Sequence, residues 1–370
     1  MMRLLTAICC ATAAVVFAQS PGTPARSKAS LDTPQSQINQ APIKLLDFKP
    51  SDGPSGLSIS PVTTMPAECS PDGTLFLDML DVKDLRKHTV VSIKEDKTQT
   101  YSPEAIRGLN DITVVSFFPS DSLAGFLVRA TTETLGPRTP GSSPAGVPWS
   151  KYHYYVAEFN RDGTYRKSVL LDVDYPLSRL AILTSGEFLV TGYDNVNSAA
   201  HLLLLDSSGQ IEHEFDLPAF QRPADANAPY GSAESMNNSS RLLGYVLFTP
   251  YKEDILVWHV GSADPIMDIG TGGSFREVPL QAPPDTELVN MIPASDRWVA
   301  LFRTKGLAEN IPLNRKDYAW YEFSPVDGGL VAKLSEDGSN PPHSIACEKE
   351  GAYISFQRVK DDKIAMLIAR

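Results

Sequence analysis

The tetrapeptide Ser70-Pro71-Asp72-Gly73 is a turn signal between an apolar run and a segment rich in aromatic and β-branched residues. The same arrangement returns at Ser120-Asp121-Ser122, Thr184-Ser185-Gly186, Asn238-Ser239-Ser240, Ser295-Asp296-Arg297 and Lys349-Glu350-Gly351. Counted from Gly73, Ser122, Gly186, Ser240, Asp296 and Gly351, successive turns are 49, 64, 54, 56 and 55 residues apart. This nearly regular step predicts a chain built from repeated β-structured units.

A second set of turns divides the repeats again, at Asn160-Arg161-Asp162-Gly163-Thr164, Asp206-Ser207-Ser208-Gly209-Gln210 and Val326-Asp327-Gly328-Gly329. Asp-Gly and Ser-Gly pairs tolerate the positive φ that tight hairpins need. The step from Gly163 to Gly186 is 23 residues, and the step from Gly328 to Gly351 is the same. A period near fifty residues with two hairpin turns predicts an all-β fold, a six-bladed β-propeller of four-stranded blades with the first strand innermost.

The last repeat contains only three strand-like runs, which the sequence places at 344–348, 352–359 and 363–368. The run Ile43–Phe48 is the only β-like segment before the first repeat, so we expect it to pair beside 363–368 and complete the last blade. An N-terminal strand in this position closes the ring and removes two exposed edges. The other blades are predicted at 65–101, 111–171, 179–217, 241–278 and 289–334.

The architecture resembles the six-bladed β-propeller superfamily, broadly the NHL-like and related exported bacterial propellers. The resemblance covers residues 43 to 370 and rests on the blade spacing and on hairpin turns such as Arg161-Asp162-Gly163-Thr164. It supplies no functional residues. The alternative fold is a pair of β-sandwiches with a boundary near Ala224-Asp225-Ala226, which does not explain the even spacing.

The N-terminus has the composition of an export signal. Arg3 precedes an apolar core from Leu4 to Phe17, and Val16-Phe17-Ala18 is a small-x-small cleavage sequence. We therefore expect a signal peptide at 1–18, a disordered leader rich in Pro, Ser and Gln at 19–41, and one propeller domain at 42–370. The mature protein is expected in the periplasm or secreted.

The charge of the chain limits the classes of partner that it can bind. The formal net charge of the 370-residue chain is −11, and its charges are interspersed without a basic stripe. This pattern argues against nucleic acid as a partner, and no later apolar run is long enough for insertion into a membrane. We expect a monomer whose ligand is a protein, a peptide or a glycan.

The predicted long loops gather on one face of the ring, between second and third strands and between blades. Long loops on a rigid scaffold commonly carry binding. The main hypothesis is therefore a non-catalytic binding or scaffold protein that uses this rim and needs no cofactor. The candidate contact residues on it are Arg138, Trp149, Tyr193, Asp194, Tyr230 and Arg315.

The centre of the ring supports a competing hypothesis. Some six-bladed propellers hold a divalent cation there and hydrolyse lactones, and carboxylate and amide oxygens are the ligands that Ca²⁺ prefers. The resemblance therefore implies, as the alternative, a metal-dependent hydrolase or lyase with Ca²⁺ or another divalent cation in the channel. Oxygen-bearing side chains near the expected inner strands are Glu68, Asn110, Asp111, Asn290 and Glu348.

Two cysteines remain after the export signal, and they occupy equivalent places. Cys69 and Cys347 each lie four residues before a turn glycine, Gly73 and Gly351. Their blades are the first and the last, which are neighbours in a closed ring. Equivalent positions on adjacent inner strands approach each other, so we expect a disulfide in an oxidising compartment. The alternative is a pair of buried free thiols.

Overall fold

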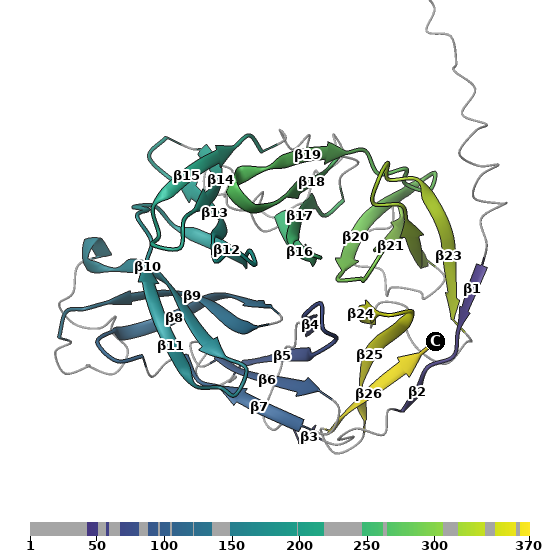
Figure 1. Ribbon diagram of the computed structural model, residues 1–370, viewed down its shortest axis with the longest axis horizontal. Helices are drawn as coiled ribbons and strands as arrows, with labels where there is room; N and C mark the ends of the chain where they lie inside the picture. Colours follow the sequence, from purple (N-terminus) through teal and green to yellow (C-terminus); the bar gives the residue numbers. More distant parts are fainter. Residues whose placement is uncertain are drawn as a thin grey trace, which may run out of the picture.

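A computed structural model describes residues 43–50, 57–58, 67–80, 88–94, 97–103, 106–120, 122–134, 149–197, 199–217, 246–261, 265–305, 317–336, 345–359 and 363–370. The expected export signal and leader lie outside the described residues. Six sheets surround a common axis (Figure 1). Neighbouring strands in a sheet follow one another along the chain, except where N-terminal strands join the last two sheets. The fold is therefore the six-bladed β-propeller that the spacing predicts, rather than a pair of sandwiches.

Blades one to three have four antiparallel strands each. Blade one contains β4 (Ala67–Cys69), β5 (Leu75–Leu80), β6 (His88–Lys94) and β7 (Lys97–Tyr101). Blade two contains β8 (Asn110–Pro119), β9 (Leu123–Thr131), β10 (His153–Asn160) and β11 (Tyr165–Leu170). Blade three contains β12 (Leu177–Ile182), β13 (Phe188–Asp194), β14 (Ala199–Leu205) and β15 (Ile211–Phe215).

Blades four to six repeat the pattern. Blade four contains β16 (Val246–Tyr251), β17 (Asp254–His259), β18 (Ile266–Ile269) and β19 (Phe275–Val278). Blade five contains β20 (Thr286–Ile292), β21 (Trp298–Thr304), β22 (Tyr318–Phe323) and β23 (Leu330–Glu336). Blade six contains β24 (Ile345–Lys349), β25 (Ala352–Val359) and β26 (Lys363–Ala369).

The predicted turn of blade four was wrong. Asn238-Ser239-Ser240 lies outside the described residues, whereas the innermost hairpin of this blade pairs Tyr251 with Asp254. Its turn is Lys252-Glu253, and Lys252 has a positive φ of 55°. A search for turns by Gly, Asn and Ser misses such a turn, because a lysine occupies the left-handed position here.

An N-terminal segment completes the last blade, as expected, but the residues that pair with this blade differ from those predicted. β2 (Lys49–Pro50) and β3 (Leu57–Ser58) both pair antiparallel with β26. The run that was expected there begins with β1 (Ile43–Leu46), which instead pairs parallel with β23 of blade five. Blades five and six each present an outer edge to this segment, and an isolated β-like run does not specify which edge it joins. The N-terminal segment therefore bridges two blades (Figure 1).

The buried carboxylate of Glu322 lies at the centre of an ionic cluster that includes Lys44 of β1. Glu322 on β22 accepts hydrogen bonds from Arg297 (2.9 Å) and from the Tyr353 hydroxyl on β25, and Lys44 Nζ of β1 lies 3.6 Å from the same carboxylate. Tyr353 is fully buried, and the Lys44 ammonium lies 4.8 Å from the centre of its ring. Burial raises the pKa of Tyr353, and the hydrogen bond to Glu322 raises it further. The tyrosine therefore stays a neutral donor that connects blades five and six.

Deleting residues 19–50 should lower the melting temperature of the ring, whereas deleting residues 19–38 should leave it unchanged. The longer deletion removes β1 and β2, exposes the outer edge of β23 and the part of the β26 edge that pairs with β2, and takes Lys44 from the Glu322 cluster. The shorter deletion ends before the first strand of the described chain. Thermal unfolding followed by circular dichroism measures the difference. Equal melting temperatures for the two variants would contradict this account of closure.

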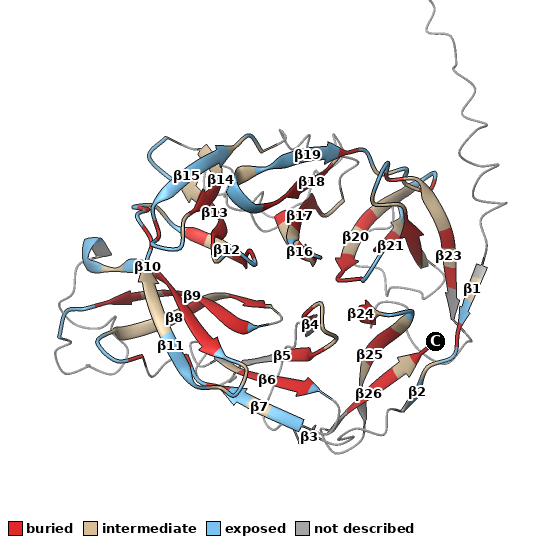
Figure 2. Ribbon diagram, in the orientation of Figure 1, coloured by how far each residue is buried: buried red, intermediate tan, exposed pale blue. Residues whose placement is uncertain are grey.

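Most core side chains lie on the inner and middle strands, and exposure grows toward the outer strands (Figure 2). Large aromatic side chains fill the spaces between blades, as Phe76, Tyr101, Phe126 and Phe159 do between blades one and two. Each such fully buried side chain contributes roughly 1.5–3 kcal/mol of hydrophobic stabilisation. The core is thus distributed around the ring and leaves its axis unfilled.

Glycines in the outer turns bring successive blades into close contact. Gly163, Gly209 and Gly328 all have positive φ, and each lies against the outermost part of the preceding blade. A Cβ at Gly209 would lie 2.0 Å from the carbonyl oxygen of Leu170, and one at Gly328 would lie 2.1 Å from that of Pro279. Backbone hydrogen bonds accompany the contact, such as Asp172 N–H to Gly209 O at 2.9 Å. The second set of turns is therefore where one blade docks on the next.

The predicted disulfide is present. Cys69 on β4 and Cys347 on β24 are bonded, with their Cα atoms 5.7 Å apart, and both are 1% exposed. Lys349 supports the same junction, because its ammonium donates a 2.7 Å hydrogen bond to the carbonyl oxygen of Asp72. The first and last blades are thus joined covalently at the innermost strands, where the ring closes.

Candidate functional site

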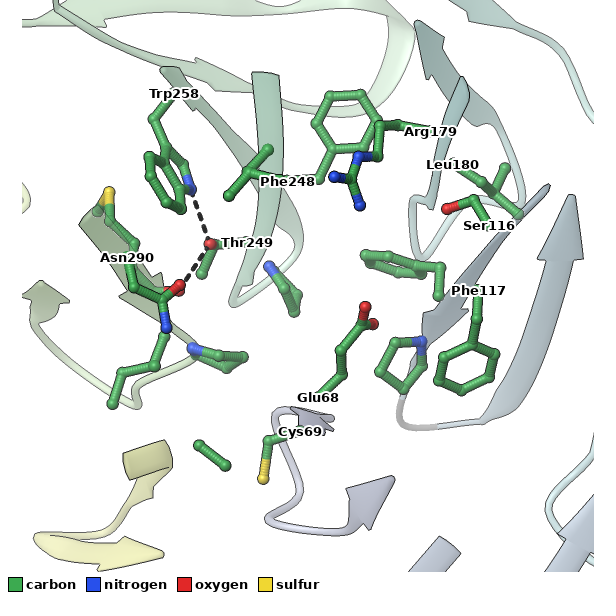
Figure 3. Close-up of a pocket in the computed structure, with 18 of the residues that line it drawn as sticks. Glu68, Cys69, Ser116, Phe117, Arg179, Leu180, Phe248, Thr249, Trp258 and Asn290 are labelled. Carbon is green, nitrogen blue, oxygen red and sulfur yellow. Dashed lines mark hydrogen bonds between the residues drawn. The ribbon is translucent and has the colours of Figure 1, made fainter. Parts of the chain in front are cut away.

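The six innermost strands surround a cavity of about 380 Å³ on the axis of the ring (Figure 3). They contact one another in ring order, β4, β8, β12, β16, β20 and β24, and the last contacts the first. Every one of them contributes side chains to the cavity. Its volume falls within the range of about 300–1,000 Å³ that is usual for small-molecule sites.

Backbone bulges precede three polar residues that line this cavity. The pairing register shifts between Val114 and Ser116 on β8, between Leu177 and Arg179 on β12, and between Leu288 and Asn290 on β20. A bulge inserts one unpaired residue and re-aims the side chains that follow. In each strand, the residue just after the bulge lines the cavity, namely Ser116, Arg179 and Asn290. Local strand irregularity thus delivers three of the polar side chains that line the cavity.

The charged side chains among the described residues that line the cavity are Glu68 and Arg179. They project into it from blades one and three (Figure 3). Burial lowers the pKa of the Arg179 guanidinium, and the Glu68 carboxylate offsets only part of this shift. Because a guanidinium stays protonated in proteins, the cavity holds one positive and one negative group that interact with each other.

One side of the cavity is lined by aromatic side chains, and hydrogen bonds hold part of this wall. Phe117, Phe248 and Trp258 contribute aromatic surface. The indole N–H of Trp258 donates a 3.0 Å hydrogen bond to Thr249 Oγ1, and this hydroxyl donates a 3.2 Å bond to Met291 O on β20 (Figure 3). Both Thr249 and Trp258 are buried, so this chain connects blades four and five and fixes the indole. The wall is preorganised before any ligand arrives.

The cavity brings together two of the five predicted metal-site residues, Glu68 and Asn290. Asn110 and Asp111 lie at the other end of β8, where Asn110 donates to Glu133 O and Asp111 accepts from the Tyr152 hydroxyl at 2.8 Å. Glu348 accepts from the backbone N–H groups of Ser295 and Gly351. In the part of the chain that the structure describes, no three His, Cys, Asp or Glu side chains gather as a metal site would require.

Little of the predicted loop rim can be placed. Arg138, Tyr230, Arg315 and the side chain of Trp149 lie outside what the structure describes. Tyr193 and Asp194 are the last two residues of β13 rather than loop residues. Asp194 accepts hydrogen bonds from the backbone N–H groups of Val196 (2.7 Å) and Asn197 (3.2 Å), so it shapes the short turn to β14.

Sequence reasoning missed Arg179 and Ser116 as cavity residues. The sequence did contain a signal for Arg179. This residue lies within the mainly apolar run Leu177-Ser178-Arg179-Leu180-Ala181-Ile182, at the start of a predicted blade where the innermost strand is expected. An arginine inside such a run must face a channel or a partner, since its charge is costly to bury alone. Ser116 gave no comparable signal, because only the bulge after Val114 turns it toward the axis.

Comparisons with protein-family models and with curated proteins find no match. Among solved structures, a catalytically inactive virginiamycin B lyase from Staphylococcus aureus with quinupristin aligns at 14% identity, over 87% of this chain and 99% of that chain, with a TM-score of 0.34. A streptogramin B lyase aligns at 14% identity over 87% and 86%, with a TM-score of 0.39. A sialidase from Trypanosoma rangeli aligns at 10% identity over 87% of this chain and 58% of its own, with a TM-score of 0.39.

At these identities and TM-scores, the likenesses carry neither residues nor an activity over to this chain. The class that the structure defines is a six-bladed β-propeller with an axial cavity. Among the residues described, no helix is long and apolar enough to cross a membrane.

Proposed function

We propose that this protein is an exported, non-catalytic binding propeller whose axial cavity takes a small ligand or one group of a larger partner. The observation that supports it most is the convergence of all six inner strands on one cavity, with bulges before three of the polar residues that line it. An expected export signal and a disulfide suit the oxidising periplasm or cell exterior.

The side chains that face the cavity have the exposure of a binding site. Glu68, Ser116, Arg179, Phe248 and Asn290 are half-buried, and they line the cavity from five of the innermost strands. Their neighbours on these strands are locked by strand pairing and hydrogen bonds. Because rigid elements hold the polar groups before binding, less conformational entropy is lost when a ligand arrives.

Replacing Ser116 by phenylalanine should abolish binding of small molecules in the axial cavity. The added ring occupies space that a ligand would need, while β8 keeps its pairing. Ligand-observed NMR with a diverse fragment set measures binding to the wild type and to the variant, and circular dichroism checks the fold. Ser207→Phe, in the exposed turn after β14, is the matched control and should bind the same fragments as the wild type.

A wild-type protein that binds no fragment, or that binds its fragments equally well after Ser116→Phe, would overturn the axial site. The axial site is supported if the wild type and Ser207→Phe bind the same fragments and Ser116→Phe does not.

The alternative function is a metal-dependent hydrolase or lyase that uses the same channel. It draws on Glu68 and Asn290, which both line the cavity and could each offer an oxygen to a divalent cation. Under the binding proposal, treating the purified protein with a chelator leaves its melting temperature unchanged. A stoichiometric Ca²⁺ or other divalent cation, whose removal lowers the melting temperature, would favour the enzyme instead. Metal analysis before and after chelation decides between them.

The long-loop rim remains part of the proposal as the surface for a protein, peptide or glycan partner. In its described portion, the Tyr193–Asp194 end of β13 leads into a turn where the apolar Val196 is 91% exposed and accessible to a partner. Hydrogen exchange of the loops with and without such a partner tests this surface separately from the axial cavity.

A further inference from the structure

We propose that the ligand of the axial cavity is a small zwitterion with an apolar side group, such as a hydrophobic amino acid, held between Arg179 and Glu68. This inference rests on the proposed binding function and specifies its ligand class. In this arrangement the Arg179 guanidinium binds the ligand carboxylate, the Glu68 carboxylate binds the ligand ammonium, and the aromatic wall holds the side group.

The charge balance of the cavity favours a ligand that carries both charges. Glu68 and Arg179 are the charged residues among the described ones that line it, so this described lining carries no net charge. A ligand with a carboxylate alone would add an unbalanced negative charge to a partly desolvated site, and an amine alone would add a positive one. Unbalanced charges are costly away from water, whereas a zwitterion keeps the site neutral and places one opposite charge beside each of the two protein groups.

The two charged groups also differ in ways that suit the two ends of such a ligand. A guanidinium presents paired N–H donors that match the two oxygens of a carboxylate, and these charge-assisted bonds are roughly twice as strong as neutral ones. A carboxylate such as that of Glu68 accepts hydrogen bonds from an ammonium group. The two side chains project into one cavity from blades one and three, so a single small molecule can reach both (Figure 3).

The rest of the wall selects for an apolar group. Phe117, Phe248 and Trp258 line the cavity together with Leu247 and Met291. Because the hydrogen bond from Trp258 to Thr249 already satisfies the indole N–H, the indole has no donor left for the ligand. Contact with the wall is therefore favoured by a ligand group that buries hydrocarbon.

Isothermal titration with matched ligands tests the zwitterion without altering the protein. The series is L-phenylalanine, 3-phenylpropionate, which lacks the ammonium, and phenethylamine, which lacks the carboxylate. L-Leucine, 4-methylpentanoate and 3-methylbutylamine form a second series. We expect an amino acid to bind about tenfold or more tightly than either single-charge analogue, because each analogue loses hydrogen bonds to a charged group. Glycine, which lacks the side group, should bind more weakly than both amino acids.

Two substitutions in the cavity should then change which single-charge analogue the protein prefers. Arg179→Gln should weaken amino-acid binding about tenfold or more and leave the amine bound at least as tightly as before. Glu68→Gln should do the converse and spare the carboxylate analogue. If either variant fails to fold, the two ligand series on the wild type still decide the matter.

The outcomes separate the two levels of the proposal. If fragments bind in a manner that Ser116→Phe abolishes, but amino acids bind no better than their single-charge analogues, the zwitterion is wrong and the axial site stands. If no fragment binding depends on Ser116, the axial site itself fails. If Ser116→Phe abolishes amino-acid binding, and the Arg179 and Glu68 variants change the ligand preference as described, both the axial site and the zwitterionic ligand are supported.

Discussion

Replacing Cys69 and Cys347 together by alanine is expected to lower the free energy of unfolding by about 4–5 kcal/mol. The disulfide joins residues 278 positions apart, so it closes a loop of nearly the whole domain. In the chain-entropy model such a link stabilises the fold by restricting the unfolded chain, and more so for longer loops. Denaturant titration of the oxidised wild type and of the double variant measures the difference.

Reduced wild-type protein is the matched control, since it keeps both sulfur atoms in the core while opening the loop. We expect it to unfold near the denaturant concentration of the double variant. Coincident unfolding of all three samples would show that the β4–β24 junction is held without the disulfide, by packing and by the Lys349–Asp72 hydrogen bond.

Replacing Gly209 by alanine is expected to destabilise the propeller by about 2–3 kcal/mol more than a glycine-to-alanine change at an open turn. Its φ is +90°, and an added Cβ would lie 2.0 Å from the carbonyl oxygen of Leu170, which belongs to the backbone of the preceding blade. Backbone atoms cannot rotate away as a side chain can. The docking of blade three on blade two must therefore loosen.

Gly186→Ala provides the control within the same blade. Its φ is +94°, but the nearest atom to its added Cβ is 3.8 Å away. This variant therefore isolates the cost of the left-handed backbone, roughly 1–2 kcal/mol. Thermal unfolding compares the two. Equal losses would mean that the contact between blades contributes nothing and that the strain of the turn explains both.

The sequence predicted the blades because the propeller repeats local signals. Asp-Gly and Ser-Gly turns and apolar strands each depend on a few neighbouring residues, and the repeat places them at regular steps. The equivalence of Cys69 and Cys347 depended on the same repeat, and the disulfide was confirmed. The failures involved choices that local signals do not make. The turn of blade four was missed because Lys252, rather than a glycine, has the positive φ. The pairing of β1 was missed because this strand pairs with the edge of blade five, where Lys44 lies near the buried Glu322.

The candidate site was harder to predict, because it depends on which side of an inner strand each residue faces. A shift of one residue in register exchanges the two faces of a strand. The bulges before Ser116, Arg179 and Asn290 produce such shifts. No residue type at these positions indicates a bulge in the sequence. Glu68 and Asn290 were predicted for the channel and do line it, whereas Asn110, Asp111 and Glu348 bond to loops and turns elsewhere.

The most direct test of the central claim is a crystal structure of the protein soaked with the small molecule that binds it most tightly. The axial site predicts ligand density inside the ring, in contact with Arg179 and Glu68 and against the wall that Phe248 and Trp258 form. Density on the outer surface of the blades or at the loop rim, with the axial cavity holding only solvent, would contradict the account.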